Sequence, residues 1–141
     1  MLYTALYWAF DQFCWKWIRR VTKLPDLSGE WHCEGRTLGD GHVGDWDGKI
    51  TIVQSFDKIK VSLSTKQSTS SSRSAALFYE EGIGYRLSYN YKNEPRIGEE
   101  DLAFHWGCCE LLFDVGLTRA DGEYFNGHGR KTFGTMHLER V

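Results

Sequence analysis

The chain has 141 residues, of which 41% are hydrophobic and 26% are charged, as expected for one folded domain rather than a disordered segment. Its formal net charge of −2 at pH 7 excludes the basic field that attracts a nucleic-acid polymer, although a local site for a small phosphate-bearing ligand stays open. Aromatic residues make up 15%, with 15 glycines and only 2 prolines, which favours tight turns and a crowded interior over flexible linkers.

Residues 1–20 differ from the rest of the chain, because they are rich in aromatic residues and contain no glycine or proline. We predict a helix there, ending before Pro25. The apolar run before Asp11 is too short to cross a bilayer. Aromatic residues followed by basic ones are typical of the cytoplasmic membrane–water interface. Two alternatives are an amphipathic helix packed on the rest of the chain, and an engineered start at Met1 that follows a membrane segment upstream.

The cysteines show no spacing typical of a zinc site, and the adjacent pair is expected to point to opposite faces of one strand. We expect all of them to be reduced and structural, in a cytoplasmic compartment. The start of the chain lacks the basic region and small-residue cleavage site of a secretory signal, so we expect none. The cysteines are Cys14, Cys33, Cys108 and Cys109.

From Ser28 onward, apolar and polar side chains alternate with a period of two, which indicates strands. Successive strands with short connections favour antiparallel neighbours, and eight of them can close into a barrel that holds one small ligand. We therefore predict an all-β, eight-stranded, antiparallel, up-and-down, lipocalin-like barrel over residues 25–141, after a helix and linker over residues 1–24. The predicted strands cover residues 30–36, 46–54, 58–65, 68–79, 85–92, 101–113, 122–126 and 130–140.

Two features of this prediction have alternatives. One alternative architecture is a two-sheet sandwich. A separate alternative is that the serine-rich stretch 68–74 is a disordered loop and not a strand, because of its composition. Asn93, Pro95 and Gly98 are placed in a loop between the fifth and sixth strands.

The inward face of each strand is taken as the one opposite its charges, and it contains no Asp or Glu. Arg130 then has no acidic partner in the interior, so an anion of the ligand is its expected partner. Tyr and Trp rings suit stacking on bases. Trp31, Trp46 and His105 also fit plain core roles, and Arg130 also fits a solvated position at the rim. The predicted inward polar and aromatic residues are Trp31, Trp46, Gln54, Thr65, Ser68, Ser70, Ser72, Tyr85, Tyr89, Tyr91, His105, Tyr124, Asn126, Arg130 and Thr132.

No catalytic constellation emerges from the sequence, so we expect a binding domain and not an enzyme. There is no nucleophile elbow, inward carboxylate pair or two-histidine metal spacing, and we predict neither a metal nor a cofactor. The glycine-rich turn after Asn126 lacks the lysine and the strand-to-helix setting of a phosphate loop, and is typical of a hairpin.

Several short motifs, taken in order, resemble the β-barrel domain of CBASS anti-phage effectors with two transmembrane helices and a β-rich domain, the SMODS-associated 2TM-β group. The resemblance extends from about Pro25 to the C-terminus. Its motifs are Leu27-Ser28-Gly29-Glu30-Trp31, Trp46-Asp47-Gly48, the alternating Ser68, Ser70 and Ser72, Tyr89-Asn90-Tyr91, His105-Trp106-Gly107, and the ending from Gly122 through Arg130 to Met136.

The resemblance implies an effector of the bacterial inner membrane whose barrel faces the cytoplasm. The barrel would bind a cyclic dinucleotide made on phage infection, and the effector would then self-associate and disrupt the membrane. The two membrane helices of the group are missing from this sequence, so residues 1–20 would be the end of the second helix, and the chain itself is expected to be soluble and to sense without killing.

Roles for individual residues follow from that resemblance. Arg130, with His105, would contact the phosphates, and Tyr89, Tyr91 or Tyr124 would stack on bases. The base edges or riboses would be read by Asn93, Asn126, Thr132, Ser70 and Ser72.

Two other functions are compatible with the fold prediction. One is a lipocalin-like carrier of a small apolar ligand such as a fatty acid, or of haem with His105 as its ligand. The polar inward face argues against a lipid carrier, because such carriers line their cavities with apolar groups. The other is a structural barrel that self-associates through its N-terminal helix and binds no ligand.

Overall fold

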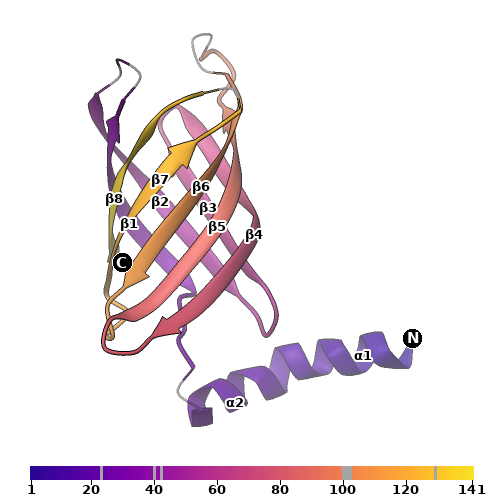
Figure 1. Cartoon of the computed structure of the whole chain (residues 1–141). Coiled ribbons are helices and arrows are strands. Elements are labelled where there is room, and N and C mark those ends of the chain that lie inside the picture. The colour runs from indigo at the N-terminus through magenta and orange to yellow at the C-terminus, as the bar shows by residue number, and fades with distance from the viewer. Residues whose placement is uncertain (23, 40, 42, 100–102, 129) are drawn as a thin grey trace.

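The computed structural model describes residues 1–22, 24–39, 41, 43–99, 103–128 and 130–141. Within them, each strand pairs antiparallel with the next, and β8 returns to pair with β1, so that the sheet closes into a barrel (Figure 1). The eight-stranded up-and-down barrel is thus confirmed, and the sandwich and the disordered serine loop are wrong. The strands are β1 (Gly29–Leu38), β2 (Gly44–Gln54), β3 (Ile59–Thr65), β4 (Ser68–Glu80), β5 (Gly84–Pro95), β6 (His105–Phe113), β7 (Arg119–Asn126) and β8 (Phe133–Arg140).

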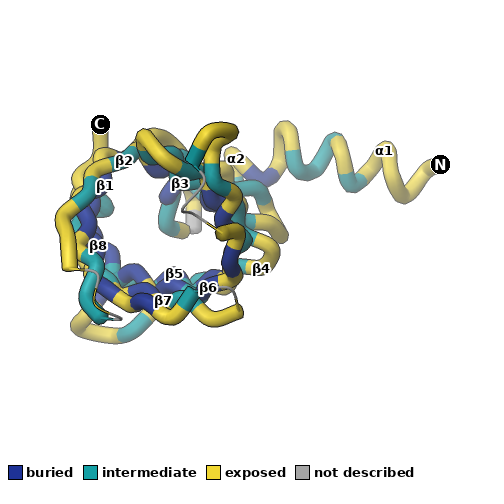
Figure 2. The backbone as a smooth tube through the Cα atoms, turned by 90° about the horizontal axis from the view of Figure 1, so that it is seen from above, coloured by how far each residue is buried: buried dark blue, intermediate teal, exposed yellow. Residues whose placement is uncertain are grey.

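The strand alternation sorts side chains between the barrel interior and the solvent. Viewed along the barrel, the buried residues alternate with exposed ones around the wall (Figure 2). Near the N-terminal linker the interior is filled by apolar side chains, with Trp31 and Phe113 fully buried in an edge-to-face contact at 5.1 Å between ring centroids. The cysteines follow the same rule: Cys109 is buried, its neighbour Cys108 is half-buried, and all four are free thiols, as predicted.

Several predicted strand limits differ from those in the structure, and β7, for example, begins at Arg119 and not at Gly122. Asn93 belongs to β5 and not to a loop, because Pro95 is the last residue of that strand and its missing N–H costs no ladder bond there. The sixth strand begins at His105, and its predicted start at residues 101–102 lies outside the described residues. Residues 130–132 precede β8, because the Asn126 N–H donates to the Thr132 carbonyl at 2.7 Å and closes a turn before the ladder resumes.

A glycine on β7 is required by a close approach between backbones. A Cβ at Gly122 would lie 2.0 Å from the carbonyl oxygen of Glu110 on β6, which is backbone and cannot turn aside. We therefore expect Gly122→Ala to lower the free energy of unfolding by about 1–3 kcal/mol, measured by urea denaturation. Gly44→Ala is the matched control, since nothing lies within 4 Å of its Cβ position. Equal stability of the two variants would contradict this packing.

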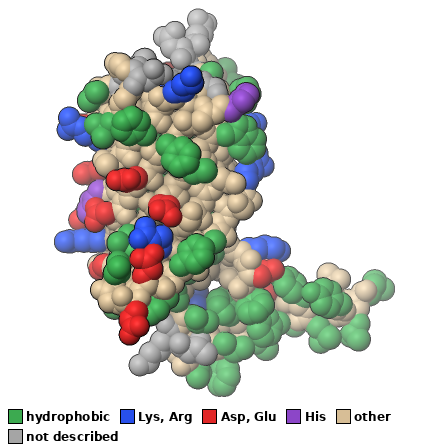
Figure 3. Space-filling model, viewed as in Figure 1, with side chains coloured by type: hydrophobic (Ala, Val, Ile, Leu, Met, Phe, Trp, Pro, Cys, Tyr) green, Lys and Arg blue, Asp and Glu red, His purple; other side chains and the backbone are tan. Residues whose placement is uncertain are grey.

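A single helical segment precedes the barrel, as predicted, and projects from the end where β2 turns into β3 (Figure 1). It consists of α1 (Leu2–Ala9), a π-helical turn η1 (Phe10–Cys14) and α2 (Trp15–Thr22). Its outer surface is largely hydrophobic (Figure 3). Among the described residues, no helix has both the length and the apolar character needed to cross a membrane.

The helix contacts the barrel at the β2–β3 turn. Phe56 packs against Phe10 and Trp15 with ring centroids 4.9 and 5.4 Å apart, and its N–H donates to the Asp11 carboxylate at 3.1 Å. The Tyr7 hydroxyl donates to Asp57 at 2.6 Å. The segment is therefore docked at one point, while much of its apolar surface stays exposed.

Phe56→Ala is expected to loosen this docking without destabilising the barrel. Each aromatic pair contributes about 0.5–1.5 kcal/mol, so we expect amide hydrogen exchange in residues 2–21 to accelerate about tenfold. Phe78→Ala is the matched control, since Phe78 and Phe56 have the same exposed fraction of 52%. Unchanged exchange in the Phe56 variant would show that these ring contacts do not hold the helix.

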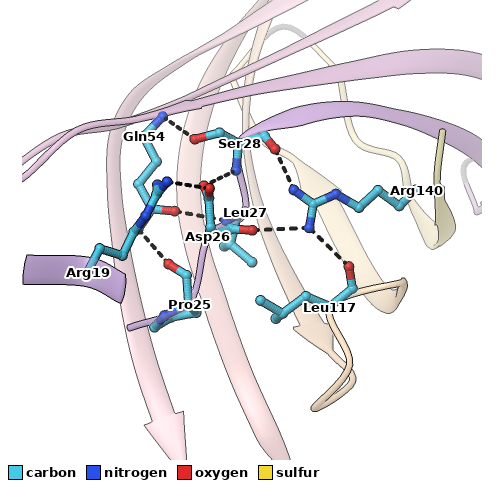
Figure 4. Close-up of polar contacts among 8 residues, drawn as sticks. All are labelled: Arg19, Pro25, Asp26, Leu27, Ser28, Gln54, Leu117 and Arg140. Carbon is cyan, nitrogen blue, oxygen red and sulfur yellow. Dashed lines mark hydrogen bonds and ion pairs between the residues drawn. The ribbon is translucent and has the colours of Figure 1, made fainter. Parts of the chain in front are cut away.

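The linker before β1 is held by hydrogen bonds and an ion pair at the same end of the barrel (Figure 4). The side-chain amide of Gln54 donates to the Pro25 carbonyl at 3.1 Å and accepts the Leu27 N–H at 3.0 Å. Arg19 on α2 forms an ion pair with Asp26 at 2.7 Å. The guanidinium of Arg140 donates to the carbonyls of Asp26, Leu117 and Ser28 at 3.1, 3.2 and 2.6 Å. Gln54, predicted to face inward, therefore serves to close this end.

Candidate ligand cavity

A cavity of about 460 Å³ occupies the other end of the barrel. This volume lies in the range of small-molecule sites, about 300–1,000 Å³. The wall comes from the ends of the strands around the β1–β2, β3–β4, β5–β6 and β7–β8 connections. Because strand connections alternate between the two ends of an antiparallel barrel, this opening lies opposite the helix.

The cavity brings together nine of the ten site residues predicted from the sequence. They are Ser70, Tyr89, Tyr91, Asn93, His105, Tyr124, Asn126, Arg130 and Thr132. Ser72 is the exception and does not line the cavity. Its hydroxyl accepts a hydrogen bond from the Val61 N–H at 2.9 Å. The pairing of β3 with β4 ends next to this position, so the Val61 N–H bonds to a side chain and not to the backbone of β4. A register shift between Ser72 and Ser74 follows directly.

Hydrogen bonds fix the side chains on one wall of the cavity. The Tyr91 hydroxyl donates to the side-chain oxygen Oδ1 of Asn126 at 2.7 Å, and the side-chain nitrogen Nδ2 of Asn126 donates to the Thr132 hydroxyl at 2.7 Å. The Tyr124 hydroxyl accepts the indole N–H of Trp46 at 3.3 Å. These side chains are therefore held in place before a ligand arrives, which reduces the entropy that binding would cost.

The tyrosine rings are also packed against other rings. Tyr89 and Tyr91 lie 6.0 Å apart between centroids, and Tyr124 meets Trp46 edge-to-face at 5.9 Å. Burial raises the pKa of the Tyr89 hydroxyl well above its usual value, so it stays protonated. Trp46 thus lines the cavity. Trp31 belongs to the core, which is the plain core role that the sequence allowed for both residues.

Arg130 lies half-buried in the connection between β7 and β8, at the wall of the cavity. Its backbone N–H donates to the Gly127 carbonyl at 2.9 Å. Its guanidinium has no hydrogen bond or ion pair with any residue that the structure describes. It is therefore a cation at a polar cavity with its donors free for an anion.

His105 is nearly buried and its Nδ1 lies 3.3 Å from the Ala103 carbonyl oxygen. Burial lowers the pKa of the imidazole below its usual value, and the positive charge of Arg130 lowers it further, while the Ala103 carbonyl raises it. The ring is therefore neutral at pH 7.

Some lining residues were not predicted. Lys66 and Gln67 come from the β3–β4 turn, next to the predicted end of a strand, and Lys66 adds a second cation. Asp45 and Asp47 border the mouth, both exposed, so the expected absence of acidic groups applies to the buried wall but not to the rim. Asp45 lies 3.8 Å from Arg36, which offsets part of its charge. Among the described residues, no group of His, Cys, Asp and Glu could hold a metal ion.

Comparison with known proteins relates the chain to a family of receptor domains. The chain is 44% identical over 142 residues to the CD-NTase-associated protein 15 of Yersinia aleksiciae, which covers 99% of the chain and 68% of the relative. It is 27% identical over 135 residues to the CD-NTase-associated protein 15 of Staphylococcus schleiferi, with 94% and 71% covered. Residues 22–140 match the family described as the Cap15 cyclic dinucleotide receptor domain. This is a receptor family, which confirms the resemblance to CBASS barrel domains and the expectation of a binding domain rather than an enzyme. The chain belongs to the Cap15 cyclic dinucleotide receptor domain family.

Proposed function

We propose that the barrel holds a cyclic dinucleotide inside the 460 Å³ cavity and serves as the sensor of a CBASS anti-phage effector. The observation that carries the proposal is Arg130, a half-buried cation without a partner among the described residues, in a cavity lined by hydroxyl, amide and aromatic groups. A half-buried guanidinium with free donors favours an anion as its partner, and the phosphates of a cyclic dinucleotide supply it.

In this proposal, the phosphates meet Arg130, and Lys66 adds a second positive charge at the mouth. The rings of Tyr89, Tyr91 and Tyr124 provide faces and edges for the bases. The polar side chains on the wall contact base edges and ribose hydroxyls.

The full-length effector self-associates when the ligand binds and disrupts the inner membrane. Two surfaces support this part of the proposal. Exposed aromatic side chains lie on the outer wall near the cavity end, and exposed apolar side chains cover the helix (Figure 3). Contiguous exposed apolar surface marks sites of contact with proteins or membranes. The outer-wall residues are Phe104, Trp106, Phe125 and Phe133.

A calorimetric screen tests the sensor proposal. The chain would be titrated with cyclic di- and trinucleotides, with linear dinucleotides and a fatty acid as controls. Saturable binding of a cyclic dinucleotide, with much weaker binding of its linear form, is the expected result. Binding of the fatty acid alone would instead favour the apolar-ligand carrier, although the polar lining of the cavity argues against it.

A further inference from the structure

Three buried polar side chains form a row across neighbouring strands inside the cavity. Asn93 on β5 is the register partner of both Ser70 on β4 and His105 on β6. The exposed fractions of Ser70, Asn93 and His105 are 9%, 7% and 6%. Since all three line the cavity, a ligand that fills it meets this row side by side.

The contacts of the Asn93 amide orient it. Its nitrogen donates to the Ser68 hydroxyl oxygen at 3.0 Å and to the Ser70 hydroxyl oxygen at 2.8 Å. Both N–H bonds of Asn93 are thus used.

The carbonyl oxygen Oδ1 of Asn93 is therefore left as an acceptor. No described residue donates to it, while the side chain lines the cavity. An acceptor that lines a cavity binds water in the free barrel and can accept from a donor of the ligand instead.

The tautomer of His105 is determined in the same way. A carbonyl oxygen only accepts hydrogen bonds, so the contact with Ala103 places the proton of the neutral ring on Nδ1. With the pKa of the ring lowered by burial, Nε2 carries a lone pair at pH 7. Nε2 is then an acceptor, which suits an N–H donor and repels a phosphate oxygen.

We propose that Asn93 Oδ1 and His105 Nε2 form an acceptor pair that selects a ligand base by its exocyclic amino group. The inference rests on the proposed function, and it moves His105 from a phosphate contact to a base contact. An amino nitrogen carries two N–H bonds and donates to both acceptors at once. Adenine, cytosine and guanine carry such a group, whereas uracil and hypoxanthine do not. The preferred cyclic dinucleotide therefore contains at least one amino-bearing base.

The test compares ligands that differ only in that group, using calorimetry on the whole chain. The panel contains cyclic di-AMP, di-GMP, di-CMP, di-UMP, di-IMP and mixed forms. The tightest ligand is expected to lose at least about tenfold in affinity when its amino base is replaced by hypoxanthine or uracil, because neither base has a group with two N–H bonds that can donate to both acceptors at once. A loss of less than threefold, or tightest binding by cyclic di-UMP, would overturn the proposal.

Two variants test whether the acceptor pair causes the preference for amino-bearing bases. Asn93→Leu and His105→Phe remove one acceptor each, and each is expected to bring the amino and deaminated ligands to within about threefold of one another. His32→Phe makes the same change on the outer wall, where the side chain is 51% exposed, and should leave the ratio unchanged. If Asn93→Leu does not fold, His105→Phe and the ligand panel still decide.

The outcomes separate this inference from the sensor proposal. Binding of cyclic dinucleotides without preference for an amino group would refute the acceptor pair alone. Absence of binding by every cyclic dinucleotide would refute the sensor proposal and the acceptor pair together. A discrimination that survives in both variants would place base recognition elsewhere in the cavity and refute the pair.

Discussion

Arg130→Ala is expected to weaken binding of the cyclic dinucleotide by at least about tenfold. A hydrogen bond to a charged group is worth about 1.5–3 kcal/mol, and a guanidinium can make two of them to one phosphate. Because the Arg130 side chain has no hydrogen bond or ion pair with the described residues, its removal breaks none of these among them. The melting temperature of the protein is therefore expected to change little, while calorimetry records the loss of affinity.

Two companion variants show whether this loss belongs to the guanidinium. Arg130→Lys keeps the charge but not the planar pair of donors, so its affinity should lie between wild type and Arg130→Ala. Arg119→Ala removes a charge from the outer wall, where the side chain is 69% exposed, and should bind as wild type does. Unchanged affinity in a folded Arg130→Ala protein would rule out Arg130 as the phosphate contact.

Trp31→Ala is expected to lower the free energy of unfolding by about 3–5 kcal/mol. The indole is fully buried, packs on Phe113, and donates its N–H to the Leu27 carbonyl at 3.1 Å. The guanidinium of Arg140 lies 5.0 Å from its ring centroid. Truncation would leave a cavity at the end of the barrel that the linker closes, and its cost is measured by urea denaturation.

Trp106→Ala is the matched control for this core prediction. Trp106 lies on the outer face of β6 with 41% of its surface exposed, so its loss should cost less than about 1 kcal/mol. Similar destabilisation of the two variants would contradict the assignment of the core to the inner face near Trp31.

The barrel was predictable from the sequence because alternation is a local signal that repeats over eight strands. Each inward position in a strand interior, such as Tyr89, follows from its neighbours two residues away. Strand ends were less predictable, because they depend on partners far along the chain. Asn93 stays in a strand since Ser70 and His105 flank it, which no pattern around Pro95 reveals.

The composition of the site was predictable, but its chemistry was not. Polar residues on the inward face indicated which side chains would converge, and nine of the ten residues assigned to the site line the cavity. Ser72 differs because the β3–β4 ladder ends beside it and leaves the Val61 N–H to its hydroxyl. The neutral state of His105 depends on its burial and its tautomer on the Ala103 carbonyl, and both are properties of the folded chain.

The central claim is that a cyclic dinucleotide binds inside the barrel, and a crystal structure of the chain with the tightest ligand of the screen tests it most directly. The account predicts ligand density within the cavity, with a phosphate oxygen about 2.7–2.9 Å from the guanidinium of Arg130. Ligand density on the outer wall or along the helix, with the cavity holding only water, would contradict it.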